Sequence, residues 1–408
     1  MRTIFFVPRY IASLKYYERL FPLVRSLGRE PSLVLFEDLG MRAYAEEKGL
    51  PYQILSEASG RLPFVSHIRA FNRLRTRVRA LLARERDALF ITEGRLPDTM
   101  KMLVHEARKA GVQVAALQWC MHSSHTEHQK RSLLRALQKM RGRDGSLVRG
   151  IPRAIYFSLL RGVFRLFDAV THERYVYSEL PERIGVFDQY SRGYFRAHGY
   201  SDESIEVVGN FDAERAREIA HTLTPEKRAA QRAAYGLPTD KPCILLLSTI
   251  FYAGNMSVCM SKEENIAYYR SLIADIRAAY GANASILFKL HPREFADAPH
   301  YADVAQVVTL EHDAEDLARI ADLYIAHPVS IVNMTARATH TPSLIINFTP
   351  LRYMDDFAPA YGIRHIITDR AEFRSALIDA ARGGADSAFE PDVEAGEFSS
   401  RLKAFLRA

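Results

Sequence analysis

The chain has 408 residues, of which 48% are hydrophobic and 25% are charged, a composition typical of a soluble globular protein. This length exceeds one typical hydrophobic core, so we expect two domains of roughly 150–200 residues each. No uncharged apolar run approaches the ~18–20 residues that a membrane span needs. The net charge of +7 indicates acidic ligands or an anionic surface as partners.

Three cysteines, Cys120, Cys243 and Cys259, are scattered without CxxC spacing. This pattern favours neither a disulfide framework nor a zinc site, and it fits a reducing compartment. The N-terminal stretch MRTIFFVPRY is interrupted by Pro8 and Arg9, so it predicts a first strand and not a signal peptide. We therefore expect a cytoplasmic protein.

Through residue 118, short apolar segments alternate with segments of helical periodicity. The predicted strands are 3–7, 32–36, 52–55, 87–92 and 112–118, and the predicted helices are 18–27, 41–48, 70–85 and 99–110. Strands that alternate with helices at this spacing indicate a parallel, doubly wound α/β sheet.

The alternation breaks after residue 118, and a basic segment follows. Between Lys130 and Arg165 the chain carries ten Lys or Arg and one acidic residue, Asp144, with Leu and Phe interleaved. This basic amphipathic insertion, residues 130–165, is either a helical hairpin packed on the first domain or a segment that attaches to the anionic inner face of the cytoplasmic membrane. No nucleic-acid-binding pattern accompanies it, so we expect no nucleic-acid partner.

The rest of the chain again alternates, and it starts a second sheet. The later strands are predicted at 182–187, 204–209, 243–249, 284–291, 305–310, 322–326, 343–347 and 364–368, and the later helices at 191–198, 213–234, 265–280, 313–320, 331–339, 372–382 and 396–406. We place the boundary after residue 215. The N-terminal domain is then 1–215, and 216–408 forms a C-terminal domain that includes a linker helix and a C-terminal helix.

The predicted strand at 284–291 ends in a cluster of polar residues, Lys289, His291, Pro292 and Arg293. In open α/β sheets, ligands bind just outside the carboxyl ends of the strands. Lysine, histidine and arginine side chains all donate charge-assisted hydrogen bonds to anions, so the cluster suits a phosphate-bearing ligand. The alternative is an ordinary strand end whose basic residues are solvated.

Four short stretches resemble the glycosyltransferases of the GT-B class. FKLHPRE (288–294) resembles the His-Pro motif of bacterial sialyltransferases, polysialyltransferases and Kdo transferases, and ADLYIAHPVSIVNMTARATHTPSLIINF (321–348) is similar to their strand, serine-containing turn and TPxxI strand. TEG (92–94) resembles their acidic motif. GYSDESIEVVGNFD (199–212) is similar to a stretch near the end of the first domain in many surface-polysaccharide transferases.

The resemblance implies two Rossmann-like domains that face an interdomain cleft, with the nucleotide-sugar donor on the C-terminal domain and the glycan acceptor and base on the N-terminal domain. It implies a bacterial inverting transferase that moves an acidic sugar, sialic acid-like or Kdo-like, from a CMP-activated donor to a capsule or lipopolysaccharide acceptor. In this class no metal is needed if a histidine and cations neutralise the leaving group.

The same resemblance implies roles for the residues of the second domain. His291, protonated or donating through one ring nitrogen, would stabilise the leaving phosphate, assisted by Lys289 or Arg293 beside Pro292. Ser330, with the first N–H groups of the following helix, would form a second anion site. Thr335, one turn further on, is a second candidate for contact with the anion. Val329 and Ile331 flank Ser330, where the family prefers two adjacent hydroxyl residues.

In the first domain, Glu93 is the candidate general base, because it follows a strand directly and precedes Gly94 at the expected cleft. Thr92 occupies the first acidic position of the motif. Asp98, a few residues further on, therefore remains an alternative as the working carboxylate.

The residues His122, His125 and His128 form an HxxHxxH series. Histidines at this spacing can share one face of a helix, which raises the question of a metal site. No carboxylate or cysteine pattern completes such a site, so acceptor contact or a polar loop are the alternatives, and we expect no metal.

Other functions share parts of these motifs. The enzyme alternatives are a UDP-sugar transferase of the GT-B class, a CDP-glycerol-type glycerophosphotransferase and a sugar-nucleotide 2-epimerase. From a different class comes a non-catalytic, membrane-associated polysaccharide assembly protein, in which the insertion 130–165 is the functional part.

Overall fold

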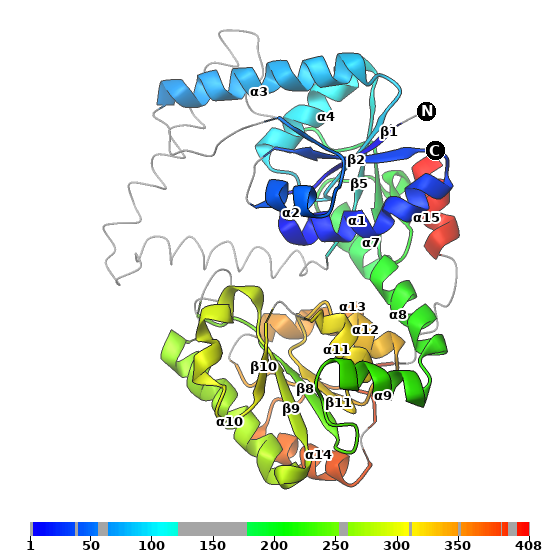
Figure 1. Cartoon of the computed structure of the whole chain (residues 1–408). Helices are drawn as coiled ribbons and strands as arrows, with labels where there is room; N and C mark the ends of the chain where they lie inside the picture. The colour runs from blue at the N-terminus through cyan, green and yellow to red at the C-terminus, as the bar shows by residue number, and fades with distance from the viewer. Residues whose placement is uncertain are drawn as a thin grey trace. The chain divides into compact units, whose positions relative to one another are not determined.

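The computed structural model describes residues 3–36, 40–55, 64–120, 178–252, 260–309, 312–349, 352–384, 386–390 and 398–407. These residues form two units, each a parallel β-sheet covered by helices (Figure 1). The first unit holds the described residues up to Gly209 together with the C-terminal helix, and the second starts at Asn210. The insertion 130–165 and the HxxHxxH histidines lie outside the described residues.

The first unit is built on a seven-stranded sheet in the order β3-β2-β1-β4-β5-β6-β7. Its strands are β1 Thr3–Val7, β2 Glu30–Leu35, β3 Tyr52–Ile54, β4 Leu89–Thr92, β5 Gln113–Leu117, β6 Arg183–Val186 and β7 Ile205–Val207. Its helices are α1 Ile11–Ser26, α2 Met41–Glu47, α3 Phe64–Arg84, α4 Asp98–Ala110, α7 Gln189–Arg196, the 3₁₀ turn η1 Asp202–Ser204 and α15 Phe398–Arg407. The chain leaves β1 for β2 on one side and returns to β4 on the other, so the topological switch point lies between β1 and β4.

The second unit is built on a five-stranded sheet in the order β10-β9-β8-β11-β12. Its strands are β8 Cys243–Leu247, β9 Ser285–Lys289, β10 Gln306–Val308, β11 Leu323–Ala326 and β12 Ser343–Ile345. Its helices and 3₁₀ turns are α8 Phe211–Thr222, α9 Pro225–Ala234, α10 Lys262–Tyr280, η3 Gly281–Asn283, η4 Pro292–His300, α11 Ala314–Ile320, α12 Asn333–Ala338, η5 Arg352–Phe357, α13 Ala358–Tyr361 and α14 Arg370–Ala381. The switch point here lies between β8 and β11.

The central strands are buried along their whole length and mostly apolar, because helices cover both faces of a parallel sheet. Every residue of β4, β8 and β11 is buried. Helix α10 starts at a capping box, in which Ser261 Oγ accepts from the N–H of Glu264 and the Glu264 carboxylate accepts from the N–H of Ser261. The helix then buries one face, including Tyr269 and Ile273, against this sheet. The predicted α/β class is confirmed.

The segment predicted as one helix over 213–234 forms two helices, α8 and α9. Thr224 breaks it, because its hydroxyl accepts from the N–H of Lys227 as an N-cap. Pro225 follows at the first helical position, where its missing N–H costs nothing. The strand predicted at 364–368 also differs: the structure shows only an isolated bridge between Ile346 and Ile367.

The border between the units differs from the one expected after residue 215. Asn210 already belongs to the second unit, where its side-chain oxygen caps α8 by accepting from the N–H groups of Asp212 and Ala213. Helix α8 then packs against α12. The border therefore falls at Gly209, before the helix.

The C-terminal helix α15 was expected in the second domain, but it packs on the first unit. Its residues Leu402 and Phe405 are fully buried there. The Arg183 guanidinium lies 4.7 Å from the centre of the Phe405 ring, and Arg29 Nη1 donates to the carbonyl of Leu406 at 2.9 Å. No helix of the described part is long and apolar enough to cross a membrane.

Candidate functional site

The carboxyl ends of β8, β9 and β11 meet at one edge of the second sheet. Their registers pair Leu247 with Lys289 and Leu246 with Ile325, so the residues that follow these strands emerge together. Ser248 follows β8, His291 comes two residues after β9, and His327 follows β11. This edge includes the switch point, which is where open α/β sheets bind ligands.

His291 is fixed by three hydrogen bonds at the start of the 3₁₀ turn η4. Its N–H donates to Ser248 Oγ at 2.6 Å, and its carbonyl accepts from the N–H of Glu294 at 2.8 Å. Its ring Nδ1 accepts from the N–H of Arg293 at 3.2 Å. Because Nδ1 is an acceptor, a neutral ring carries its proton on Nε2.

The charge state of His291 follows from its surroundings. Desolvation of the ring, and then the positive charge of Arg293, lower the pKa of His291 to about 4. The ring is therefore neutral near pH 7 and offers Nε2–H as a hydrogen-bond donor. Of the two states expected from the sequence, this favours donation through one ring nitrogen over a protonated ring.

A buried network that the sequence analysis missed supports this turn. Glu294 is 1% exposed, and its two carboxylate oxygens accept from Ser248 Oγ–H at 2.6 Å and from Asn265 Nδ2 at 2.8 Å. Burial is the main cause that raises the pKa of Glu294. Ser248 and Asn265 lie 46 and 29 residues before Glu294, so no sequence spacing could have grouped them.

A second buried carboxylate of η4, that of Asp297, binds residues at both ends of the segment that connects β8 to α10. Asp297 is 2% exposed. Its Oδ2 accepts from the Tyr252 hydroxyl at 2.7 Å, and its Oδ1 pairs with Lys262 Nζ at 2.5 Å. Tyr252 follows β8 and Lys262 starts α10, so one side chain ties both segments to η4.

The three predicted cations are brought together only in part. Arg293 is exposed, like Pro292, in the first turn of η4, and its charge acts on His291. The ammonium of Lys289 instead donates to the carbonyls of Thr309 and His312, in the segment after β10. Lys289 is therefore engaged in a structural contact with the segment after β10.

The turn after β11 does not form the helix start expected at Ser330. The N–H of Ser330 bonds the carbonyl of His327 within the turn, and α12 begins after Val332, which has no side-chain cap. Buried Asn333 holds this turn by donating to the His327 carbonyl at 3.1 Å. Thr335, one turn on, is 2% exposed inside α12. Of the two hydroxyls, only that of the partly exposed Ser330 borders the strand end.

His327 occupies the centre of this edge, yet it belongs to the core. The residue is fully buried, and burial lowers the pKa of its ring to about 3. The ring centre lies 4.9 Å from that of Phe251, and Nε2 is 3.5 Å from the Tyr268 hydroxyl. His327 thus packs neutral among aromatic rings.

In the first unit, Glu93 lies at the switch point between β1 and β4. It is 5% exposed, and its Oε1 accepts from the N–H of Arg9 at 2.8 Å. Burial raises the pKa of Glu93, and hydrogen bonds from Ser13, Arg9 and Trp119 partly oppose that rise. A carboxylate with a raised pKa at a strand end meets two requirements of a general base. Its contacts with Arg9 and Ser13 also hold the turn between β1 and α1.

The neighbours of Glu93 in the predicted motif are packing residues. Thr92 is fully buried and donates to the carbonyl of Ala115 at 3.3 Å. Gly94 is buried, and its carbonyl accepts from the Tyr200 hydroxyl at 3.2 Å. Asp98 is the first residue of α4, and its side chain lies outside the described part.

Gly94→Ala should destabilise the protein by about 1–3 kcal/mol, the usual cost of overpacking a core. A Cβ at position 94 would lie 2.4 Å from the Phe195 ring, which has no room to retreat within its cluster. Urea unfolding of the two proteins measures the difference.

Gly193→Ala is the matched control, because a Cβ at that position of α7 meets nothing within 4 Å. It should leave stability unchanged or raise it by up to ~1 kcal/mol. Equal unfolding midpoints for Gly94→Ala and the wild type would show that position 94 is not packed as described.

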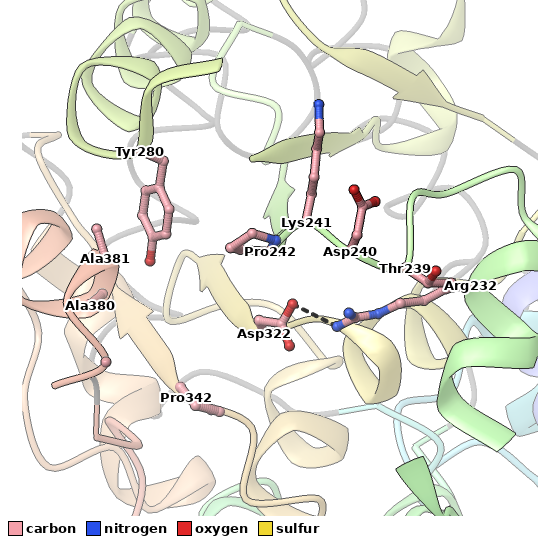
Figure 2. Close-up of a pocket in the computed structure, with 11 residues that line it drawn as sticks. Arg232, Thr239, Asp240, Lys241, Pro242, Tyr280, Asp322, Pro342, Ala380 and Ala381 are labelled. Atoms are coloured by element: carbon pink, nitrogen blue, oxygen red, sulfur yellow. Dashed lines mark ion pairs between the residues drawn. The ribbon is translucent and has the colours of Figure 1, made fainter. Parts of the chain in front are cut away.

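A pocket of about 440 Å³ opens at the opposite edge of the second sheet (Figure 2). Arg232, Tyr280 and Asp322 line it, and Asp322 accepts from Arg232 at 2.7 Å and from the N–H of Cys243 at 2.8 Å. Cys243 begins β8 and Asp322 precedes β11, so this pocket lies at the amino ends of the strands. It is therefore separate from the His291 edge.

Within the described ranges, no group of three or more His, Cys, Asp or Glu residues could hold a metal ion. The HxxHxxH histidines are not among those residues, so the absence of a metal at that series stays a prediction from the sequence.

No protein-family model matches the sequence, and no curated protein matches it significantly. Solved structures match over its whole length. The UDP-GlcNAc 2-epimerase from Methanocaldococcus jannaschii has 14% identity and a TM-score of 0.58, and the comparison covers 100% of this chain and 99% of that one. The UDP-GlcNAc 2-epimerase from Neisseria meningitidis, bound to UDP-GlcNAc, has 11% identity and a TM-score of 0.58 over 100% of both chains.

A third match is Anabaena Alr3699/HepE in complex with UDP, with 13% identity and a TM-score of 0.54 over 100% of this chain and 94% of that one. The chain has the GT-B fold. At these identities the match shows the architecture alone. The two sheets of parallel strands correspond to the two Rossmann-like domains expected from the sequence.

Proposed function

We propose that this GT-B chain is a glycosyltransferase whose nucleotide-sugar donor binds at the His291 edge of the second sheet. The proposal rests on the fixed turn after β9. There the neutral His291 ring accepts a hydrogen bond at Nδ1 from the N–H of Arg293, and its Nε2–H takes no part in that contact. A preorganised donor of this kind stabilises the charge that grows on a leaving phosphate. Arg293 supplies a positive charge beside it.

The proposed reaction is a direct displacement at the sugar's anomeric carbon. The acceptor oxygen forms a bond to that carbon as the bond to the donor phosphate breaks, and the electron pair leaves with the phosphate. The acceptor proton passes to Glu93, whose raised pKa brings it closer to a base that works near neutral pH. No step requires a metal, and the roles of Glu93 and His291 belong to this proposal.

For the nucleotide, we propose a UDP-sugar donor. The matched structures include one protein in complex with UDP and one bound to UDP-GlcNAc, which supports uridine as the nucleoside of the donor. A CMP-activated acidic sugar is the second candidate, favoured by the resemblance of FKLHPRE to the His-Pro motif of sialyltransferases and Kdo transferases.

Calorimetric titration with UDP, CMP and CDP tests the donor. Tighter binding of UDP supports the first candidate, and tighter binding of CMP supports the second. Preference for CDP points to glycerophosphotransfer, and no binding of any of the three points to a non-catalytic assembly protein. Incubation with UDP-GlcNAc then separates transfer, which releases UDP, from epimerisation, which keeps the nucleotide sugar intact.

We further propose that the insertion 130–165 attaches the enzyme to an anionic membrane face, where lipid-linked glycan acceptors occur. Each of its ten cations contributes up to ~1 kcal/mol near such a surface. Salt screens this attraction over a Debye length of about 8 Å at physiological ionic strength. The protein should therefore co-sediment with anionic vesicles at low salt, dissociate as salt rises, and ignore neutral vesicles. Absence of co-sedimentation at low salt would assign the insertion a structural role.

A further inference from the structure

We propose that Glu294 is a positioning residue, which sets the direction of the hydrogen-bond chain that holds His291 in its donor state. This inference rests on the proposed function, because it concerns how the same edge is prepared for a phosphate. The chain runs from the N–H of His291 to Ser248 Oγ at 2.6 Å, and from the Ser248 hydroxyl to Glu294 Oε2 at 2.6 Å.

The direction of this chain follows from the proton count of a serine hydroxyl, which has one proton to donate and lone pairs to accept. An acceptor at Glu294 draws the Ser248 proton to itself. A lone pair of Ser248 Oγ then faces the N–H of His291. Without that acceptor the hydroxyl is free to rotate, and the N–H of His291 loses its fixed partner.

The anchored N–H determines the state of the ring. With the His291 backbone held on both sides, by Ser248 and by the N–H of Glu294, the ring Nδ1 meets the N–H of Arg293. This contact places the ring proton on Nε2. If the turn loosens, Nδ1 loses its partner, and both tautomers become populated.

The surroundings of Glu294 are unfavourable for a charged carboxylate. Glu294 is 1% exposed, no ion pair reaches it among the described residues, and Asp297 adds a second negative charge nearby. Burying a charge without a counter-ion is costly. A single acceptor oxygen would be enough to hold the turn. A carboxylate offers two, and both are used here, one by Ser248 and one by Asn265.

Asn265 supplies a means of rescue that makes the inference testable. Its Nδ2 donates to Glu294, while its Oδ1 is buried and has no hydrogen-bond partner. In Glu294→Gln, the new amide oxygen can face Ser248 and its NH₂ can face Asn265. A flip of the Asn265 amide then presents the unused Oδ1 to that NH₂. The glutamine variant thus keeps the direction of the chain, whereas Glu294→Ala loses it.

The experiment compares Glu294→Ala, Glu294→Gln and Ser248→Ala by UDP calorimetry and by the ¹⁵N resonances of the His291 imidazole. We expect Glu294→Ala and Ser248→Ala to weaken UDP binding by about tenfold and to show mixed tautomers, on the scale of one lost hydrogen bond to a held group. Glu294→Gln should bind UDP within about threefold of the wild type and keep the Nε2–H tautomer. The double variant Ser248→Ala/Glu294→Ala should lose no more UDP affinity than either single alanine variant, because both substitutions break the same hydrogen-bond chain.

Asp322→Asn is the matched control for stability, since it weakens contacts at the opposite edge of the same sheet. It should lower the unfolding midpoint without changing UDP binding or the His291 resonances. Three outcomes overturn the inference: alanine variants that keep the wild-type tautomer, a glutamine variant that fails like alanine, or additive losses in the double variant. If the wild type binds no nucleotide, the proposed function fails, while the resonances still test the positioning of His291.

Discussion

The His291→Ala variant is expected to turn over its donor at least ~100-fold more slowly than the wild type, while it folds normally. The loss of one preorganised donor to a developing charge has this scale. His291 is exposed at the start of η4, although neighbouring atoms partly desolvate its ring, and it belongs to no buried hydrophobic cluster, so its removal leaves the core intact. Release of nucleotide from the donor, measured as initial rate, is the assay.

His300→Ala provides the control, because His300 is exposed at the far end of the same 3₁₀ segment. It should retain the wild-type rate. Wild-type turnover in a correctly folded His291→Ala protein would refute the assignment of His291.

The state of His291 also predicts how rate and stability depend on pH. Its pKa of about 4 in the folded chain lies below the ordinary value of 6.5. Between these values the unfolded chain binds the proton more readily, so this group's contribution to stability is present above about pH 6.5 and falls away towards pH 4. The rate should show no inflection from His291 between pH 6 and 8. An inflection that disappears in His291→Ala would mean that the ring works protonated.

The Glu93→Gln variant is expected to keep its nucleotide affinity and to lose transfer by ~100-fold or more, the range of a general base. The nucleotide contacts are proposed on the second unit, so the donor site is unaltered. Glutamine retains an oxygen that accepts from the N–H of Arg9 and so preserves the turn before α1. Calorimetry with UDP and a transfer assay with a glycan acceptor measure the two quantities.

Glu106→Gln is the matched control in the same unit. Glu106 is 4% exposed and pairs with Arg79 through both of its oxygens, so its loss should lower stability and leave transfer unchanged. Normal transfer by Glu93→Gln together with inactive Asp98→Asn would exchange the roles of these two carboxylates.

The apolar pattern predicted most of the two sheets, because buried parallel strands are continuous runs that end at polar residues. CILLL at 243–247 and SILFK at 285–289 are strands β8 and β9 as expected. The predicted strand ends also indicated that His291 and Glu93 lie at the carboxyl ends of their sheets. Both residues lie at those ends in the structure.

Contacts between distant segments could not be predicted in this way. The cation of Lys289 faces carbonyls after β10, a geometry set by the neighbouring strand and not by the motif around it. The partners of Glu294 come from two other elements, and a serine and an asparagine in such places resemble ordinary polar residues. The prediction of one helix over 213–234 was wrong for a local reason. Thr224 and Pro225 are a typical helix start, but the many alanines around them favour a single continuous helix.

The C-terminal helix α15 makes the first unit discontinuous in sequence. The chain leaves this unit after Gly209 and returns to it for the last helix, which supplies Phe405 against Arg183 and a carbonyl to Arg29. A single proteolytic cut after Gly209 would leave α15 on the fragment that holds the second unit, so that only its packing would join the two fragments. A fragment that ends at residue 209 would expose the surface that α15 covers, and it should recover solubility when a peptide of residues 398–407 is added. Deleting residues 398–407 would thus damage the unit that is otherwise formed by residues before 210.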